Sequence, residues 1–411
     1  MFDVSRFDSL TVLSFFNRWN QSILFFRTRT SHTSSEASSS EQLHLSLAES
    51  LAAIEKIDEA FDEAKQAGPL GSSLRELLLV RMGKLQEALL ECTDRLQPGL
   101  HFSLCRLDLH CWLVNDYNQV SAFCGQSGAA KQLVKLVQCI MSELAPKLEN
   151  STISDEGDDG IEMIELNEAS EYLYDALISP FETELVAEQP LQIHCHSSTL
   201  LDIPWSLLTS QSNPTPLFER YRLSILPGDL KIQPSEKCER SSSFSRVETW
   251  ETKSEATGSV VISNVGELEG ALKYANLVQL SLKTHEQGTF VQLADQRKRV
   301  EELFTAELDL SHVDLVVLDR AHSREVAMAL IKHGVKNVFY PLWQLPKTSV
   351  RDLIVSLEDK LESMHPLKAL QEIQFKQKNG TRFKDPSFWS AWIPIVSFKA
   401  RFFIVIKPTL L

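Results

Sequence analysis

Residues 313–343, VDLVVLDRAHSREVAMALIKHGVKNVFYPLW, decide the fold class of this chain. The stretch begins with an apolar run at 313–318, continues with apolar residues at helical spacing over 323–333, and returns to an apolar run at 337–341. Two short apolar runs that flank one helix are typical of parallel strands, because parallel pairing needs a crossover connection. The stretch therefore predicts a parallel-rich sheet of an α/β domain, with helices on its faces.

The same alternation extends over residues 166–400. Further strands are expected at 191–195, 222–226, 259–263 and 277–282, and further helices at 166–185, 267–275, 293–307 and 347–377. Residues 231–257 are polar and Ser-rich, and we interpret them as a mobile insertion. Ligands of such sheets bind at the carboxyl ends of the strands, so chemistry is expected in the loops after 277–282 and 313–318.

The chain before residue 166 has a different character. Its pattern predicts a poorly ordered tail with a Ser-rich linker over 1–43, an all-helical region over 44–149 and an acidic linker over 150–165. Residues 83–89, GKLQEAL, resemble the middle of a tetratricopeptide repeat, in which the glycine turns between paired helices and the alanine lets them approach. A single copy shows no period, so an unrelated helical hairpin stays an alternative.

Composition excludes several classes of protein. The 411 residues carry 41 Lys and Arg against 55 Asp and Glu, a net charge of −14, which argues against a nucleic-acid or anionic-membrane binder. The seven cysteines contain no C-x-x-C, which is typical of reduced thiols in the cytoplasm. The Arg- and Ser-containing start of the chain leaves an organelle transit peptide at 1–30 as an alternative.

Polar residues follow both central strands. Thr284, His285 and Glu286 come after the first, and Asp319, Arg320, Ala321 and His322 come after the second. A histidine at one strand end and a thiol at the next would make a cysteine–histidine dyad, but neither loop holds a cysteine. Two histidines are fewer than the three or four protein ligands of a zinc site, so we expect no metal and no cofactor at these loops.

These loops resemble motifs of the CHAT family, the caspase-like domains that follow tetratricopeptide repeats. Residues 280–286 (LSLKTHE) resemble the family's LHLATHG, and residues 316–323 (VVLDRAHS) resemble its VVLSACET. Weaker similarities to its remaining motifs lie at 203–205 (IPW), 217–221 (LFERY), 334–343 (GVKNVFYPLW) and 388–392 (FWSAW). Order and spacing hold over about residues 166–397.

The resemblance implies a caspase-like fold with a peptidase dyad, altered at its reacting positions. His285 stands at the dyad histidine and Ala321 at the dyad cysteine. Glu286 replaces a glycine, and Asp319 and Arg320 replace the two small residues before the nucleophile. A methyl group cannot attack a carbonyl, and a glutamate beside the oxyanion would repel its charge. The resemblance therefore predicts a pseudo-peptidase without an active catalytic residue.

Three hypotheses about function follow. The leading one is a non-catalytic scaffold that binds other proteins or peptides, for example by pairing with a sheet edge. The second is a residual cysteine peptidase in which His285 works with a thiol outside the motif, Cys195 or Cys238. The third is the C-terminal part of a longer tetratricopeptide-repeat protein with no independent activity, because a stable stack needs about three repeats.

A further pair of histidines could bind a metal ion. His194 and His196 flank Cys195 in a predicted strand, so both point to one face and could chelate an ion. A half-exposed strand face explains the pair more simply, since two ligands are too few for a zinc site.

Overall fold

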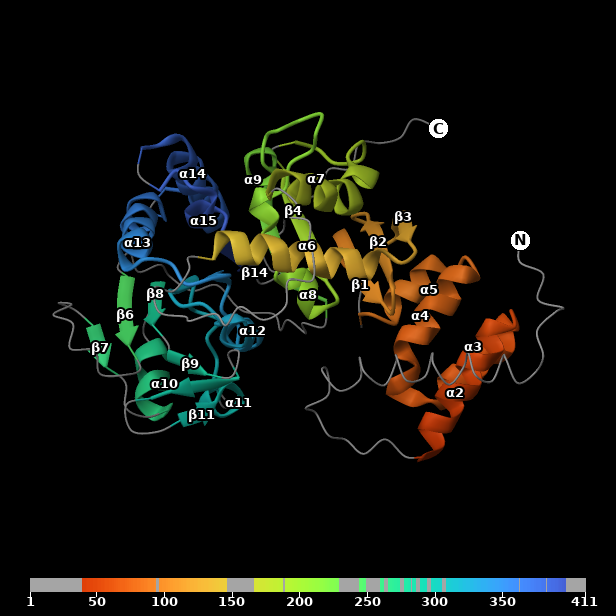
Figure 1. Ribbon diagram of the computed structural model, residues 1–411. Helices are drawn as coiled ribbons and strands as arrows, with labels where there is room; N and C mark the ends of the chain where they lie inside the picture. Colours follow the sequence, from red (N-terminus) through yellow and green to blue (C-terminus); the bar gives the residue numbers. More distant parts are fainter. Residues whose placement is uncertain are drawn as a thin grey trace, which may run out of the picture. The chain divides into compact units, whose positions relative to one another are not determined.

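The computed structural model describes the chain in segments. They are residues 39–93, 96–145, 166–187, 189–228, 244–248, 259–261, 265–273, 277–281, 283–285, 289–293, 297–304, 308–361, 363–381 and 383–396 (Figure 1). The chain divides into two compact units, residues 1–72 and 73–411.

The first unit contains a pair of helices, α2 (Ser39–Ala53) and α3 (Ile57–Gln66), followed by the short 3₁₀ helix η2 (Gly68–Gly71). The chain turns between them at Glu55, whose φ is 63°. Residues 39–43, predicted as part of a poorly ordered tail, instead begin α2, whose first turn carries the acidic residue that a helix start favours. Residues 1–38 lie outside the described part of the chain.

The second unit begins with a helical hairpin, α4 (Ser72–Arg81) and α5 (Leu85–Leu90). Gly83 turns between them with φ 74°, and Ala88 is fully buried. The segment that resembles a tetratricopeptide repeat is therefore a helical hairpin.

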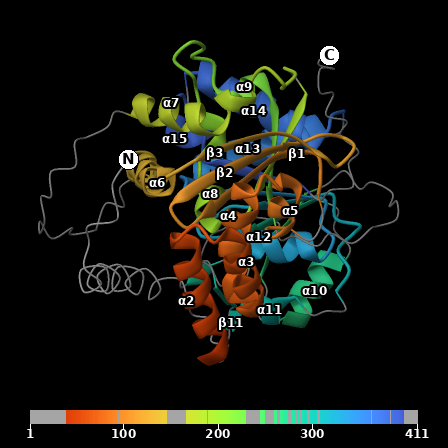
Figure 2. The same cartoon turned by 90° about the vertical axis from the view of Figure 1, so that its right-hand side faces the viewer.

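Three strands follow where the sequence predicted only helices. They are β1 (Gly99–Cys105), β2 (Asp108–Val114) and β3 (Val120–Gln126), and they form an antiparallel meander (Figure 2). In β1 the apolar residues Leu100 and Phe102 alternate with His101 and Ser103, which is the period of a strand. The prediction of an all-helical region over 44–149 is wrong for this meander.

The meander belongs to a five-stranded sheet with the order β3-β2-β1-β4-β5. β1 pairs in parallel with β4 (Pro190–Cys195), which pairs in parallel with β5 (Arg222–Pro227). The predicted linker at 150–165 lies outside the described residues, yet strands from both sides of it share this sheet.

A six-stranded sheet has the order β14-β13-β12-β8-β6-β7. Its interior strands β8 (Leu277–Ser281) and β12 (Leu315–Leu318) pair in parallel, as the sequence predicted. The remaining strands are β13 (Asn337–Pro341), β14 (Trp392–Val396), β6 (Phe244–Glu248) and β7 (Ser259–Val261). β14 runs antiparallel to β13 and lies beside β5 of the other sheet.

β6 corrects the interpretation of residues 231–257 as an insertion. It pairs in parallel with β8 and so satisfies backbone groups along one side of that strand. The structure does not describe the residues on either side of β6, which are 231–243 and 249–257. For these residues the mobile insertion stays a prediction.

Two predicted helices also differ from the structure. The helix expected at 347–377 is broken into α13 (Lys347–Leu361) and α14 (Pro366–Asn379), because Pro366 begins a new helix after the N-cap His365. Among the described residues of the helix expected at 293–307, only α11 (Val300–Leu303) is helical, and β11 (Arg297–Arg299) instead pairs with β10 (Phe290–Gln292).

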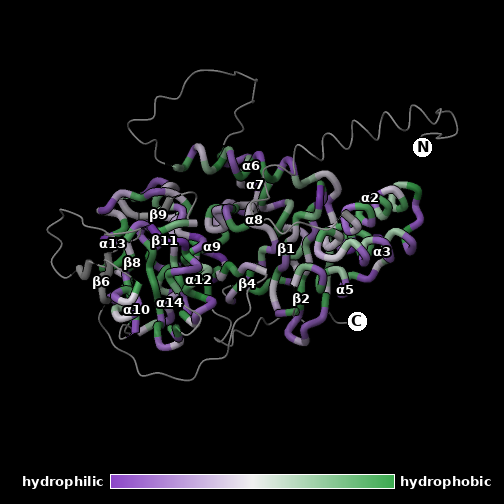
Figure 3. The backbone as a smooth tube through the Cα atoms, turned by 90° about the horizontal axis from the view of Figure 1, so that it is seen from below, coloured by the Kyte–Doolittle hydropathy of each residue, from purple (hydrophilic) through white to green (hydrophobic). Residues whose placement is uncertain are grey.

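Helices cover the sheets of this unit. α6 (Ala129–Leu144) and α7 (Leu166–Leu177) pack together and join the core of the five-stranded sheet (Figure 1). α6 shows both hydrophilic and hydrophobic segments, as expected of a helix with one buried face (Figure 3). α10 (Val265–Lys273) and α12 (Arg324–Lys332) also contribute to this core. The chain is therefore a mixed α/β protein with parallel-rich sheets flanked by helices and a helical segment at its start.

The described helices include none with the length and apolar character to span a membrane.

Candidate functional site

The carboxyl ends of β8 and β12 are joined by Asp319. This residue follows β12 directly, and its Oδ2 accepts hydrogen bonds from Gln279 Nε2, at 2.9 Å, and from Ser281 Oγ. Gln279 and Ser281 are two residues apart in β8, so they point to the same face, and both are buried. The Asp319 carboxylate therefore links the ends of β8 and β12 by hydrogen bonds. These are the two strand ends at which the sequence predicted a functional site.

The turn after Asp319 places a buried methyl group beside an exposed imidazole. Ala321 is only 9% exposed, whereas His322 is exposed and has the left-handed φ of 59°. Ser323 is fully buried at the start of α12, and its hydroxyl donates to the Arg320 carbonyl at 2.6 Å. The predicted nucleophile position thus carries a side chain without any reacting atom.

The loop after β4 reaches the same turn. Arg324 donates from its guanidinium to Asp202 Oδ1 at 3.0 Å and to the Ser198 carbonyl at 3.3 Å, in the segment that contains α8 (Ser198–Leu201). Burial raises the pKa of the Asp202 carboxyl, and the charge of Arg324 opposes this rise. The ends of β4 and β12 are therefore held together by an ion pair.

Cys195, one of the two thiols considered outside the motif, is buried at the end of β4. Its thiol is 2% exposed and donates to the Leu200 carbonyl at 3.6 Å. Burial raises the pKa of the Cys195 thiol well above its ordinary value, and the negative charge of Asp202 acts in the same direction. A thiol that stays protonated is a poor nucleophile, so Cys195 is inert in this arrangement.

The remaining site residues of the sequence prediction are only partly described. His285 ends β9 (Lys283–His285) and pairs with Phe290 in a three-stranded sheet, but its side chain lies outside the described structure. Glu286 and Cys238 also lie outside it. The expected proximity of His285 and Ala321 therefore stays a prediction.

Sequence reasoning found two members of a histidine cluster and missed the third. His194 of β4 and His101 of β1 pair in register, and their rings stack with centroids 4.1 Å apart and an interplanar angle of 5°. The His196 ring is inclined by 15° to that of His101, with centroids 5.3 Å apart, and its Nε2 lies 3.1 Å from His101 Nδ1. The expectation of a half-exposed strand face is wrong for His194, which is 3% exposed because both faces of β4 are covered.

The imidazoles of His101 and His194 are packed as neutral rings. Burial lowers the pKa of His101 well below its ordinary value and that of His194 to about 3, and the charge of neighbouring imidazoles acts in the same direction. Their ring nitrogens already have partners: His101 Nδ1 contacts His196 Nε2, and the Nε2 atoms of His101 and His194 contact the carbonyls of Gln97 and Pro98. These contacts would have to break before the nitrogens could bind a metal ion.

No protein-family model matches the chain, and no curated protein matches it.

Proposed function

We propose that the α/β part of the chain, which the resemblance covers over about residues 166–397, is a CHAT-like, caspase-like domain that has lost peptidase activity and acts as a scaffold by binding other proteins or peptides. The observation that carries this proposal is the buried methyl group of Ala321 at the end of β12, where the family resemblance expects a nucleophilic thiol.

The environment of Ala321 adds an electrostatic argument. Asp319 places a hydrogen-bonded carboxylate two residues before it. A carboxylate at this turn disfavours both a thiolate and the oxyanion of a tetrahedral intermediate, because each would add a second negative charge nearby. The site therefore opposes acyl transfer through its charge as well as through the missing thiol.

Packing among the segments that resemble the family's weaker motifs also supports the proposal. The Phe218 and Trp389 rings lie 5.2 Å apart, and Trp343 Nε1 donates to the Ser387 carbonyl at 2.8 Å. Trp205 is buried and donates to the Leu200 carbonyl at 3.1 Å. The contact of Phe218 with Trp389 joins two of these segments, and all four aromatic side chains belong to one core, which favours a shared fold over four chance similarities.

The proposal includes the cytoplasm as the compartment. No disulfide joins the cysteines of the described residues, which is typical of proteins in a reducing environment. The net charge of −14 favours protein or peptide partners over nucleic acid and anionic membranes.

The loss of activity can be tested with a peptidyl electrophile of the kind that labels cysteine peptidases. The purified wild type and His285→Ala are treated in parallel, and adducts are mapped by mass spectrometry. We expect no adduct that depends on His285. A His285-dependent adduct on Cys238 would instead establish the residual peptidase and overturn the proposal.

Binding can be tested by selecting displayed extended peptides on the purified chain. We expect enriched peptides to lose at least tenfold in affinity for His322→Asp, at the turn beside Ala321. They should keep their affinity for Tyr117→Ser, a matched change at a side chain that is 84% exposed in the described structure. Absence of any enriched peptide, or equal binding to both variants, would contradict binding at the strand ends.

A further inference from the structure

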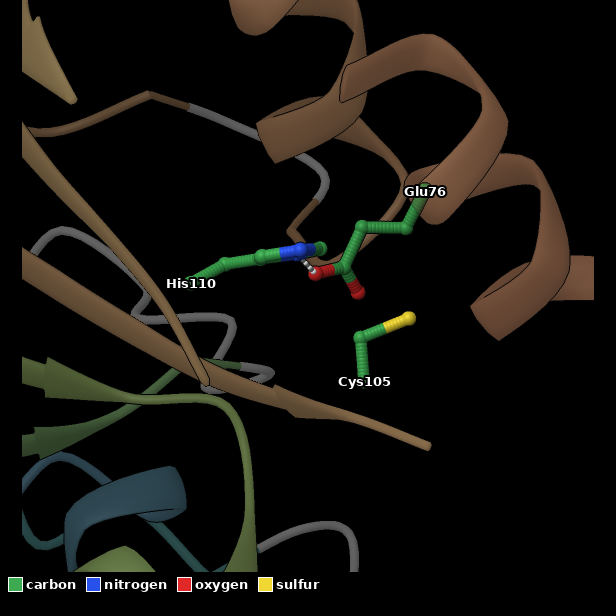
Figure 4. Close-up of side chains that lie close together, drawn as sticks. All are labelled: Glu76, Cys105 and His110. Carbon is green, nitrogen blue, oxygen red and sulfur yellow. Dashed lines mark hydrogen bonds and ion pairs between the residues drawn. The ribbon is translucent and has the colours of Figure 1, made fainter. Parts of the chain in front are cut away.

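A second buried polar cluster lies on the β1–β2 hairpin, built from residues other than those of the strand ends. Glu76 of α4, Cys105 of β1 and His110 of β2 point toward one another (Figure 4). One ligand atom from each lies within 4.8 Å of the others, and the three residues are 4%, 1% and 3% exposed. This arrangement concentrates three metal-ligating groups in the interior of the second unit.

The hairpin register explains how two of them meet. Ser103 of β1 lies opposite His110 of β2, and Cys105 lies opposite Asp108 beside a turn at Arg106, whose φ is 58°. Residues two apart in a strand share a face, so Ser103 and Cys105 present their side chains on the same side. Glu76 then approaches this face from α4.

Hydrogen bonds hold the carboxylate among polar partners. Glu76 Oε1 lies 2.6 Å from His110 Nδ1, and Oε2 accepts from Ser103 Oγ at 3.0 Å and from Cys92 Sγ at 3.1 Å. Cys105 Sγ donates to the Ser73 carbonyl at 2.7 Å. The contacts of Glu76 thus bring a second thiol, that of Cys92, to the cluster.

We propose that this cluster is a Zn²⁺ site in which Glu76, Cys105, His110 and Cys92 supply four ligands. Thiolate, imidazole and carboxylate are the ligands that zinc takes in proteins, and structural zinc sites are closed and four-coordinate. Ligand atoms around a tetrahedral zinc lie about 3 to 4 Å apart, so the ligand atoms of Glu76, Cys105 and His110 need to close by only about 1 Å. Cys92, whose Sγ contacts Glu76 Oε2, would turn toward the ion as the fourth ligand. Calcium and magnesium prefer oxygen ligands alone, which disfavours them here.

Metal binding at this cluster exchanges thiol protons for the ion. Binding of Zn²⁺ forms two zinc–thiolate bonds and releases the two thiol protons to solvent, while His110 binds as the neutral imidazole.

Aromatic rings cover the His110 side of the cluster. The Trp112 ring contacts His110 edge-on with centroids 5.6 Å apart, and the Phe123 ring lies 5.8 Å from it. Ser103 donates to Glu76 and would orient the carboxylate from behind, as outer partners of zinc ligands do. The ion would link α4, the segment after α5 and the hairpin, which is a structural role that does not depend on the proposed scaffold function.

The experiment uses the purified full chain, stripped with a chelator and titrated with Co²⁺. We expect one equivalent of Co²⁺ to give the d–d bands of a tetrahedral ion and a thiolate-to-cobalt charge-transfer band, both removed by Zn²⁺. Cys105→Ser, Cys92→Ser and His110→Ala should each weaken binding by at least about tenfold. Cys111→Ser, a buried neighbour on β2 whose thiol faces the Ala176 carbonyl, is the matched control and should bind as wild type does.

The wild type provides a second readout that needs no variant. At a free Zn²⁺ concentration about a hundredfold above Kd, its Tm should rise by about 5 °C over the chelated protein. No saturable binding and no rise in Tm would identify the cluster as a metal-free hydrogen-bonded network. A cobalt spectrum that is unchanged in Cys105→Ser would show that the ion binds elsewhere. A spectrum that is unchanged in Cys92→Ser would show that Cys92 is not the fourth ligand. Either result overturns the proposed site.

Discussion

According to the proposed function, peptidase activity is lost at the side chain of position 321. Ala321→Cys adds a thiol but leaves Asp319 and Glu286 in place, and two carboxylates raise the pKa of a neighbouring thiol. We expect this variant to react slowly with iodoacetamide and to cleave no peptide. Ala321→Cys/Glu286→Gly/Asp319→Ser should react faster, since the opposing charges are gone and a glycine returns to the turn.

The measurement is the rate of iodoacetamide labelling against pH for wild type and both variants. A new thiol in the triple variant that reacts no faster than Cys238 would mean that the loops of His285 and Ala321 do not meet.

Asp319 makes a separate contribution, to stability. Removal of its carboxylate leaves the buried donors of Gln279 and Ser281 without this acceptor. We expect Asp319→Ala to lower the free energy of unfolding by about 1–3 kcal/mol, and Asp319→Asn, which keeps a carbonyl acceptor, by less. Urea unfolding measures both. Asp175→Ala, at an exposed position of α7, should change stability by less than about 0.5 kcal/mol. Equal losses for Ala and Asn would contradict the role of the acceptor.

The histidine stack predicts a loss of stability in acid. The folded pKa of His194 is lowered to about 3 and that of His101 well below normal, whereas the unfolded chain titrates near 6.5. Below about pH 6.5 the unfolded state binds protons on these histidines, whereas the folded state keeps the rings neutral. The free energy of unfolding that these histidines contribute above this pH is therefore lost as the pH falls toward 3. Each histidine contributes a slope of about 1.4 kcal/mol per pH unit.

Denaturant unfolding between pH 7 and pH 5 measures this slope. It should become shallower in His194→Gln and stay as in the wild type in Leu107→Ala, a change at an exposed side chain that does not titrate. Parallel pH profiles of wild type and His194→Gln would show that the stack does not exclude protons.

Sequence could locate some site residues but not others, for a physical reason. Asp319 and Ala321 were found because they directly follow a buried apolar strand, so their place depends on local pattern alone. Glu76, Cys105 and His110 come from a helix and two strands with no motif spacing. Their proximity depends on the hairpin register and on the packing of α4, which the order of residues does not reveal.

At the scale of elements, strands covered on both faces were the easiest to predict. β12 is a continuous apolar run, β8 is apolar except for Gln279 and Ser281, and every residue of both is buried. β1 was missed, although its apolar and polar residues alternate, because its polar positions are filled by buried histidine and serine instead of exposed charges. β6 was missed because its sequence, FSRVE, is polar and lies among serines, which is typical of a loop. Pairing with β8 overrides this local preference.

Gly99 sits where the meander joins the parallel strands, and its backbone requires glycine. Its φ is +136°, and a Cβ there would lie 2.7 Å from the Gln192 carbonyl oxygen of β4. We therefore expect Gly99→Ala to destabilise the protein by about 1–3 kcal/mol in thermal or urea unfolding.

Gly270 provides the matched control for Gly99. It lies within α10, and a Cβ there would meet nothing within 4 Å. Gly270→Ala should stabilise by about 0.4–1 kcal/mol. A Gly99→Ala protein as stable as the wild type would show that the β1–β4 junction tolerates rearrangement.

At the scale of the whole chain, the fold class was predictable and the extent of the domain was not. Composition change at 150–165 suggested a boundary, but β1 pairs with β4 across it, and residues from Leu100 to Val396 share one core. The chain instead divides after Ser72, between helical segments of similar composition. The segments that fold together are determined by strand pairing between distant parts of the sequence. A local change in composition gives no information about that pairing.

This organisation predicts how fragments of the chain behave. Residues 73–411 keep the second unit whole and should unfold in one cooperative transition. A fragment of residues 166–411 loses the meander, which uncovers one side of β4 and removes the buried Leu100, Phe102, Leu109 and Leu113 from the core. Each buried side chain of this kind contributes about 1.5–3 kcal/mol, against a total stability of about 5–15 kcal/mol, so loss of the meander should abolish folding.

Size-exclusion chromatography and thermal unfolding compare the two fragments directly. We expect the longer fragment to elute as a discrete species and to unfold cooperatively, and the shorter one to aggregate because an unpaired strand offers its backbone groups to other chains. If residues 166–411 instead give a discrete species with the melting temperature of the longer fragment, the meander is an appendage of an independent domain. The boundary near 150–165 that the sequence suggested would then be the physical one, and the pairing of β1 with β4 would contribute little to the free energy of folding.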